Sequence, residues 1–224
     1  MFDSVFWTKW WRYFEGIIGP SIFATLRMLI ATMILAFILG FALSIALVVT
    51  RPGGLNPHKK IYKVLDLIVN VVRSFPIIIL IVAMSPITKM VVGTTIGEKA
   101  AILPLTVAAT PFLARILENA LIQVDPQLIE AARSFGASNM QIFFRVLLKE
   151  AVPGIVSGTT LATITYLSCT TMAGAVGAGG IGAVALNYGY QSFNNMVLYT
   201  GVIILCIMVQ VIQWVGNWLY KKLC

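Results

Sequence analysis

Charged residues are scarce in this sequence, and one long stretch has none. Asp, Glu, Lys and Arg make up 11% of the 224 residues and hydrophobic residues 59%, whereas a soluble domain carries roughly 25% charged residues. No Asp, Glu, Lys, Arg or His occurs from Ala151 to Tyr220. These roughly 70 residues are enough to cross a ~30 Å hydrocarbon layer more than once. The scarcity of charge argues against a soluble fold and predicts an all-α polytopic membrane protein.

The residue types that build most active sites and metal sites are also missing. His58 is the single histidine, and Cys169, Cys206 and Cys224 show no CxxC or other partner spacing, so we expect neither a zinc site nor a disulfide framework. The sequence has no GxxxxGK[ST] loop, acidic cluster or Ser/His/Asp set. We therefore expect a chain with no catalytic residue, no metal and no cofactor of its own.

The net charge of +8 is compatible with two interpretations. A nucleic-acid-binding protein would carry its basic residues along one surface, interleaved with aromatic residues. Here the basic residues lie in short clusters beside apolar spans, which is the pattern of a membrane topology signal. We favour the membrane interpretation and expect no nucleic-acid partner.

Five membrane spans are predicted from the apolar runs. Each is long enough to cross a bilayer, except the third, which we expect to borrow turns at both ends. The second carries Arg73 with Pro76 and Pro86. The spans run approximately over Pro20–Val49, Ile61–Met90, Ala100–Ala114, Ala151–Met172 and Met196–Tyr220.

Basic residues in short loops predict the orientation, because the side with more Lys and Arg is cytoplasmic. The richer side has ten, against Lys9, Arg12, Lys89 and Lys99 on the other. This places the amino terminus outside and the carboxy terminus inside a cell membrane. The ten are Arg51, Lys59, Lys60, Lys63, Arg115, Arg133, Arg145, Lys149, Lys221 and Lys222.

We expect residues 1–224 to form a single membrane domain with two segments outside the lipid. Residues 1–19 are aromatic and charged, which favours an interfacial segment at headgroup depth over a flexible tail. Residues 115–150 carry both charge signs and are predicted to be a cytoplasmic loop of short amphipathic helices.

This loop contains the signals of two short helices. Asp125 is expected to cap a helix that begins at Pro126 and ends near Phe135. Gly136 is expected to adopt the left-handed conformation after that helix. Ser138 and Gln141 form an S-x-x-Q capping box for the next one. A helix of under three turns is unstable alone, so we expect it to be held by docking.

The segment Glu130-Ala131-Ala132-Arg133-Ser134-Phe135-Gly136, followed by Val146-Leu147-Leu148, resembles the EAA loop of binding-protein-dependent ABC importer permeases. The resemblance implies the fold of a type I importer permease and a coupling helix that sits in a groove of a separate ATPase subunit. If the resemblance holds, the residues that couple to the ATPase are Leu128, Glu130, Ala131, Ala132, Arg133, Phe135 and Gly136, with Ile129 as a further apolar contact.

Two positions differ from the family pattern of this loop. Val146 replaces an isoleucine, and Lys149 replaces a proline that would break the helix. We expect Pro153 to take over as the proline at the start of the fourth span.

Longer stretches, from VRSFPIII to LENAL and GAVGAGGIGAVALNYGY, are similar to the permeases of methionine importers, a five-span branch of the family. This similarity implies two copies of the chain lining one pathway, two ATPase subunits that bind ATP and Mg²⁺, and an extracytoplasmic substrate-binding protein. The cargo is then L-methionine and, by extension, D-methionine. Another amino acid or a small peptide remains an alternative.

Between the fourth and fifth spans lies a literal GxGxxG match, Gly177 to Gly182. It follows no predicted strand and has no acidic residue about 20 positions later, so a nucleotide fingerprint is disfavoured. We expect an outer hairpin or re-entrant turn in which glycines allow close backbone packing. We expect this hairpin to present four polar residues to the binding protein: Asn187, Tyr188, Tyr190 and Gln191.

Polar residues inside the spans suggest a transport pathway. Ser74, Ser168, Thr171 and Met172 are candidates for lining or gating it, although hydroxyls that tie helices together are the more common use. Arg73 is costly inside a span unless it has a partner, for which Asp66 and Glu118 are candidates.

A secondary transporter that needs no ATPase is the rival class of function. It would require intramembrane carboxylates for ion coupling. Spans one, four and five contain none, which disfavours it.

Overall fold

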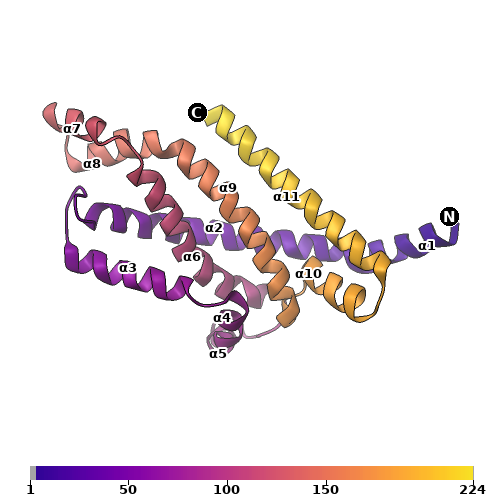
Figure 1. Ribbon diagram of the computed structural model, residues 1–224. Helices are drawn as coiled ribbons and strands as arrows, with labels where there is room; N and C mark the ends of the chain where they lie inside the picture. Colours follow the sequence, from indigo (N-terminus) through magenta and orange to yellow (C-terminus); the bar gives the residue numbers. More distant parts are fainter. Residues whose placement is uncertain (1–3, 224) are drawn as a thin grey trace. The chain divides into compact units, whose positions relative to one another are not determined.

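The computed structural model describes residues 4–223, and these form helices and connections without a strand (Figure 1). Cys224 and residues 1–3 lie outside the described part. Along the chain come α1 (Ser4–Tyr13), the π-helical turn η1 (Phe14–Ile18), α2 (Gly19–Thr50), α3 (Lys59–Arg73), α4 (Ile77–Ala83), α5 (Ser85–Val92), α6 (Glu98–Ile122), α7 (Pro126–Ser134), α8 (Asn139–Ile142), η2 (Phe143–Leu147), α9 (Leu148–Ala173), η3 (Gly174–Ala178), α10 (Gly180–Val184), η4 (Ala185–Gln191) and α11 (Asn195–Leu223).

The described residues include four helices long and apolar enough to span a membrane, and a fifth span if one bent pair is counted. The four helical stretches are Trp7–Thr50, Glu98–Ile122, Asn139–Ala178 and Asn195–Leu223. They contain the predicted first, third, fourth and fifth spans. The all-α polytopic fold with about five spans is therefore confirmed.

The predicted second span, Ile61–Met90, corresponds to a bent pair of helices followed by a further short helix. Helices α3 and α4 meet at a 98° bend, and α5 is a further short helix. The sequence explains the break: a proline disfavours helical geometry in the residue before it, and Pro76 lies at the N-cap of α4 with an extended ψ of 131°. Phe75 and Pro76 therefore separate the helices.

The third span extends at both ends beyond Ala100–Ala114, as predicted. Helix α6 extends through Arg115 and Glu118 to Ile122, so the first eight residues of the predicted 115–150 loop belong to this helix. Its two charged side chains satisfy each other (see below), which explains why a helix that crosses the membrane can contain them.

The start of the fourth span also differs from the prediction. The helix continues through Lys149, and Pro153 lies inside α9 instead of at its start. Because lysine keeps the backbone N–H that proline lacks, replacing the family proline removes the expected break.

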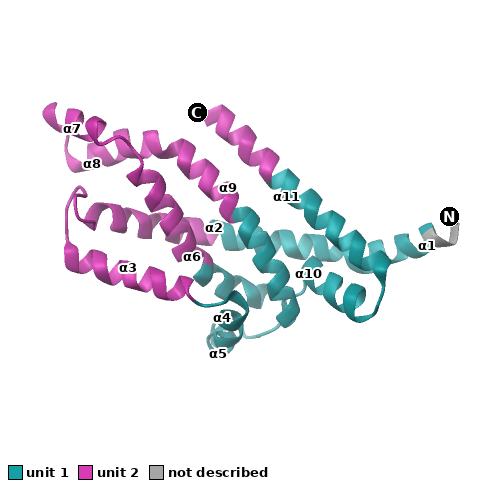
Figure 2. Ribbon diagram, in the orientation of Figure 1, with its two compact units in different colours: residues 1–34, 75–108, 163–212 teal, residues 35–74, 109–162, 213–224 magenta. Residues whose placement is uncertain are grey.

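The described residues group into two compact units, each assembled from three separate stretches of chain (Figure 2). Unit 1 comprises residues 1–34, 75–108 and 163–212, and unit 2 comprises residues 35–74, 109–162 and 213–224. In unit 2, a core cluster that includes Val48, Leu121, Ile142 and Leu147 joins α2, α6 and the α8–α9 region. A single domain over residues 1–224 stays a prediction.

The amino-terminal segment is helical in its described part. Trp10 stacks on Phe14 with a ring-centroid distance of 5.0 Å, and its indole N–H donates to Thr200 Oγ1 at 3.1 Å. This bond fixes α1 to the start of α11 within unit 1. The placement of residues 1–19 at headgroup depth stays a prediction.

Candidate functional site

Helix α7 has the caps that the sequence predicts. The Asp125 carboxylate accepts a hydrogen bond from the backbone N–H of Gln127 at 2.9 Å, and Pro126 occupies the first turn. Gly136 follows with φ at +78°, a left-handed conformation that glycine adopts without a Cβ penalty. The helix ends at Ser134, one residue before the predicted end.

The next helix begins with the predicted capping box. Ser138 Oγ accepts from the Gln141 N–H at 3.3 Å, and Gln141 Oε1 accepts from the Ser138 N–H at 2.9 Å. Figure 1 shows α7 and α8 side by side at one end of unit 2. The connection between them, residues 135–138, is thus held by hydrogen bonds at both ends.

The predicted coupling residues separate into two faces of α7. Leu128, Glu130, Ala131, Arg133 and Phe135 are exposed, and so is Gly136 after the helix. The Phe135 ring is 91% exposed, which is unusual for a large apolar side chain in a capped, ordered turn.

Ala132 and Ile129 lie on the other face. They pack against the unit 2 core cluster that includes Leu121 and Leu147. Ile129 and Ala132 are half-buried because the 3.6-residue period turns them inward, and their contact with a partner stays a prediction. Leu128 and Phe135 remain as exposed apolar residues, and Glu130 and Arg133 as exposed charges.

A charged network that the sequence did not predict joins α3 to α6 inside unit 2. Arg115 donates to Glu118 at 2.7 Å and forms an ion pair with Asp66. Asn70 bridges Asp66 and Arg115 at 3.1 and 3.3 Å, and Tyr62 donates to Glu118 at 3.4 Å. The Glu118 side chain is only 1% exposed, so the network neutralises a buried carboxylate.

This network corrects two expectations. Arg115 belongs to helix α6 and not to a loop, and Arg73 is not the partner of Asp66 or Glu118. The Arg73 guanidinium lies 5.9 Å from the centre of the Phe112 ring instead, a cation–π contact. The i, i+3 spacing of Arg115 and Glu118 was the one signal in the sequence that could have indicated their pairing.

The candidate pathway residues fall in both units. Ser168, Thr171 and Met172 occupy the last turns of α9 in unit 1, where Ser168 and Met172 are exposed and Thr171 is half-buried. The Thr171 hydroxyl donates to the Ser168 carbonyl at 2.7 Å. Ser74 lies at the C-cap of α3 in unit 2, exposed, and donates to the Asn70 carbonyl at 2.8 Å. Two of the three hydroxyls, those of Ser74 and Thr171, thus donate to helix carbonyls.

The glycine-rich segment forms the tight hairpin that the sequence predicts. A Cβ on Gly182 would overlap the backbone of Thr171, and one on Gly174 would overlap the backbone of Ala183. The Ile181 N–H donates to Thr25 Oγ1 at 2.9 Å, which joins the hairpin to α2. The close packing that we expected of these glycines is confirmed.

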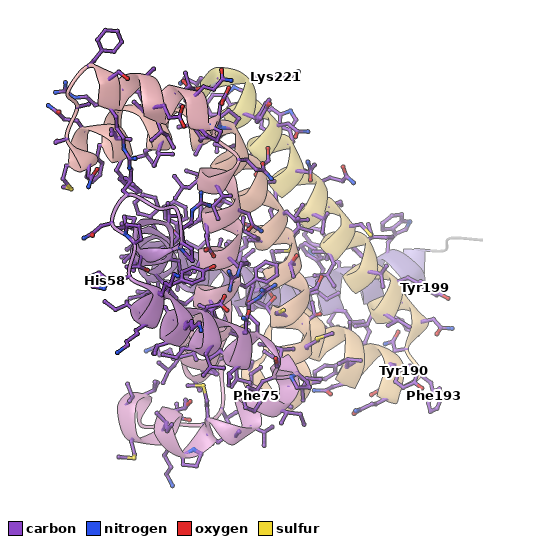
Figure 3. The ribbon with its side chains drawn as sticks, turned by 60° about the vertical axis from the view of Figure 1, so that its left-hand side comes forward. His58, Phe75, Tyr190, Phe193, Tyr199 and Lys221 are labelled. Carbon is purple, nitrogen blue, oxygen red and sulfur yellow. The ribbon has the colours of Figure 1, made fainter. Side chains whose placement is uncertain are left out.

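The residues predicted to contact a binding protein are all exposed: Asn187, Tyr188, Tyr190 and Gln191. Two further aromatic residues of the same region, Phe193 and Tyr199, are also exposed. Figure 3 shows Tyr190 and Phe193 together at the turn before α11. Phe193 has a φ of +52°, uncommon for a residue other than glycine, and this conformation cannot be read from the sequence.

Among residues 4–223, no group of three His, Cys, Asp or Glu side chains is arranged to hold a metal ion. The arrangement therefore offers helix surfaces for partners and a membrane-spanning framework.

Comparison with known proteins identifies the family. Residues 40–223 match the model of the family described as "Binding-protein-dependent transport system inner membrane component". The "Probable D-methionine transport system permease protein MetI" of Vibrio cholerae is 39% identical over 214 residues, which cover 96% of this chain and 95% of that protein. The D-methionine transport system permease protein MetI of Escherichia coli K12 is 46% identical over 154 residues, 69% of this chain and 71% of that protein.

Solved structures agree with these relatives. A chain from the inward-facing MetNI methionine ABC transporter, in its native CY5 crystal form, superposes with a TM-score of 0.91. It is 42% identical, over 94% of this chain and 97% of that chain. A chain of an amino acid ABC transporter crystallised with histidines shares the fold, with a TM-score of 0.79 at 17% identity. The match over residues 40–223, together with these relatives, establishes that the chain belongs to the family of binding-protein-dependent transport system inner membrane components.

Proposed function

We propose that this chain is the permease subunit of an ATP-driven importer of methionine. Two copies line one pathway, and two ATPase subunits, which bind ATP and Mg²⁺, dock beneath them. A substrate-binding protein delivers methionine from outside. The chain itself hydrolyses nothing and holds no cofactor.

The exposed face of α7 is the observation that carries the proposal. Phe135 and Leu128 are large apolar residues left in solvent by a helix that is capped and backed by its own core. Burying them against a partner stabilises a complex, because each buried apolar side chain contributes roughly 1.5–3 kcal/mol. Glu130 and Arg133 flank them as exposed charges. Movement of the ATPase subunits then reaches the spans as a rigid-body motion of α7.

The distribution of basic residues supports a cytoplasmic position for α7. Every lysine and arginine assigned above to the inner side belongs to the segments of unit 2, which also contain α7. With the bent pair of α3 and α4 counted as one span, the chain has five spans, and a cytoplasmic α7 then places the carboxy terminus inside and the amino terminus outside.

The exposed aromatic residues before α11 supply the surface for the binding protein. Tyr188, Tyr190, Phe193 and Tyr199 combine apolar rings with few charges, as is typical of residues that dominate protein interfaces. Asn187 and Gln191 add hydrogen-bonding groups at its rim.

Ser74, Ser168, Thr171 and Met172 are the proposed pathway and gate residues. The Met172 thioether is flexible and polarisable, which suits contact with an apolar thioether substrate. Methionine as cargo is supported by the names of the two relatives described above, both of which mention D-methionine transport, and these names favour transport of the D isomer beside the L isomer.

Uptake in proteoliposomes tests this function. The chain is reconstituted with the ATPase and binding protein encoded beside it, and ATP-dependent accumulation of labelled L- and D-methionine is measured. Accumulation that requires all three proteins is expected. Uptake that persists without the ATPase would instead establish a secondary transporter, and ATP hydrolysis stimulated by the binding protein without methionine uptake would mean another cargo.

A matched pair of variants tests the coupling face. Phe135→Ala is expected to reduce ATP-driven uptake at least tenfold, since a central interface residue contributes about 2 kcal/mol or more. Gln123→Ala, an exposed change just before α7, should leave uptake unchanged. Equal uptake by both variants would remove α7 from the coupling step.

A further inference from the structure

Unit 2 contains a cavity of about 230 Å³ between α7 and the ends of α2 and α6. Its lining includes both apolar and charged residues. Val48 and Leu121 supply apolar surface, whereas Arg51 and Arg133 supply two guanidinium groups and Glu130 one carboxylate. The cavity can therefore hold a ligand that carries both an apolar part and an anionic group.

Arg51 has a buried polar atom that is unsatisfied. Its Nε is buried and has no hydrogen-bond partner in the described part of the chain, although buried polar groups are nearly always hydrogen-bonded. Neither Arg51 nor Arg133 makes an ion pair within residues 4–223, and the nearby Glu118 is held by Arg115 and Tyr62. Arg51 interacts electrostatically with Glu118 without a hydrogen bond to it, so the two arginines that line this cavity are available to bind phosphate, as guanidinium groups commonly do.

A second cavity of about 290 Å³ also has Leu55 in its lining. Six of its eight lining residues are apolar, among them Ile45, Val49 and Phe143, and the other two are Asn56 and Asn139. Leu55 is the one residue that lines both cavities. Space for a charged group beside space for a hydrocarbon chain is what a membrane lipid requires at the boundary between headgroups and acyl chains.

We propose that the arginine cavity binds the phosphate of a phospholipid from the cytoplasmic leaflet, with an acyl chain against the apolar cavity beside Leu55. Basic pockets between membrane helices on the cytoplasmic side commonly bind lipid headgroups. An ethanolamine headgroup suits the charges best, because its phosphate pairs with Arg51 and Arg133 while its ammonium faces Glu130.

The bound lipid would then contact the coupling helix, since Glu130 and Arg133 belong to α7. The inference rests on the cytoplasmic position of α7 in the proposed function. It does not depend on the cargo or on the ATPase.

Binding of short-chain lipid to the purified full-length chain in detergent tests the proposal. Three probes separate the sources of the phosphate: diheptanoyl-phosphatidylethanolamine, diheptanoylglycerol without phosphate, and free phosphoethanolamine. We expect the phospholipid to bind more tightly than either of the others, and Arg51→Gln to weaken its binding about tenfold, as for the loss of a charge-assisted hydrogen bond. Arg145→Gln, which makes the same charge change outside the cavity, should bind as the unchanged chain does.

Two results of the binding experiment would contradict the proposal. Equal phospholipid binding by the Arg51→Gln and Arg145→Gln variants would remove the site. Phosphoethanolamine that binds as tightly as the phospholipid would make the ligand a soluble phosphate compound. If Arg51→Gln fails to fold, Arg133→Gln at an exposed position replaces it, with the same expected weakening. Lipid binding is measured without the ATPase. If the lipid does not bind, the uptake assay therefore still tests the permease role separately.

Discussion

Arg115 connects two helices through carboxylates that lie far apart in the sequence. Asp66 on α3 and Glu118 on α6 both bond to it. An ionised carboxylate is costly in a membrane helix unless it is paired, and here Asn70 and Tyr62 complete the hydrogen bonding. The network explains how α3 and α6 can carry these acids without the ion coupling of a secondary transporter.

Removing Arg115 should therefore destabilise the protein more than removing another arginine. Arg115→Leu leaves Glu118 buried and unpaired, and we expect a loss of about 3–5 kcal/mol, measured by denaturant unfolding in detergent. Arg73→Leu, which removes an exposed guanidinium, should cost under about 1 kcal/mol. Adding Glu118→Leu to Arg115→Leu should restore much of the loss. Equal effects of the two single variants would contradict a structural role for the network.

Gly136 provides a second test on the scale of one residue. Its φ of +78° is strained for any residue with a Cβ, and a Cβ there would meet no neighbouring atom. Gly136→Ala should therefore cost about 1–2 kcal/mol through the backbone alone. Because this strain falls on the end of the proposed coupling helix, we also expect reduced ATP-driven uptake.

Gly93 is a matched control for this change. It has a φ of +85° at the end of α5, and a Cβ there would also meet no neighbour. Gly93→Ala should lower stability as much as Gly136→Ala but leave uptake per folded protein unchanged. If both variants lose uptake equally, the loss is one of stability, and Gly136 has no special part in coupling.

Among the elements, α7 and the hairpin that includes α10 were the best predicted. Their signals are local: Asp125-Pro126 and Ser138-x-x-Gln141 specify hydrogen bonds within a few residues, and the structure contains those bonds. The 98° bend after α3 was not predicted, because a proline inside an apolar run is compatible with a kinked span as well as with a break.

The packing of the hairpin against α9 predicts a difference between two glycines. A Cβ on Gly182 would overlap the Thr171 backbone, which cannot move aside, whereas one on Gly201 would contact only the Cβ and Cα of Ala185 at 3.3 and 3.9 Å. Gly182→Ala should lower stability by about 1–3 kcal/mol through overpacking. Gly201→Ala should be close to neutral. Thermal unfolding in detergent measures both, and equal melting temperatures would mean that the hairpin is not packed as described.

At the scale of the whole molecule, the distribution of basic residues supports the proposed orientation of the chain in the membrane. The basic residues assigned to the cytoplasmic side all belong to the segments of unit 2, and Lys9, Arg12, Lys89 and Lys99 all belong to those of unit 1. Positive residues are retained on the cytoplasmic side during insertion. The proposed topology therefore makes Phe135 accessible from the cytoplasm and Phe193 from outside.

Two equally exposed phenylalanines test this topology. Phe135 is 91% exposed and Phe193 90%, so cysteines at these positions differ in the side of the membrane and little in accessibility. In a background with all three native cysteines replaced by alanine, a membrane-impermeant maleimide added to intact cells or spheroplasts should label Phe193→Cys. Phe135→Cys should react only after the membrane is opened. The reverse pattern would invert the topology.

The sequence by itself determined the membrane-spanning class, the approximate spans, the caps of α7 and the family resemblance, because these depend on composition and on spacings within a few residues. Only the tertiary structure decided which face of α7 is free and that Ile129 and Ala132 face the core. It also decided that Arg115 pairs with Asp66 and Glu118, and that Arg51 and Arg133 line one cavity. These features depend on side chains brought together from distant parts of the chain, and no local periodicity encodes which of them meet.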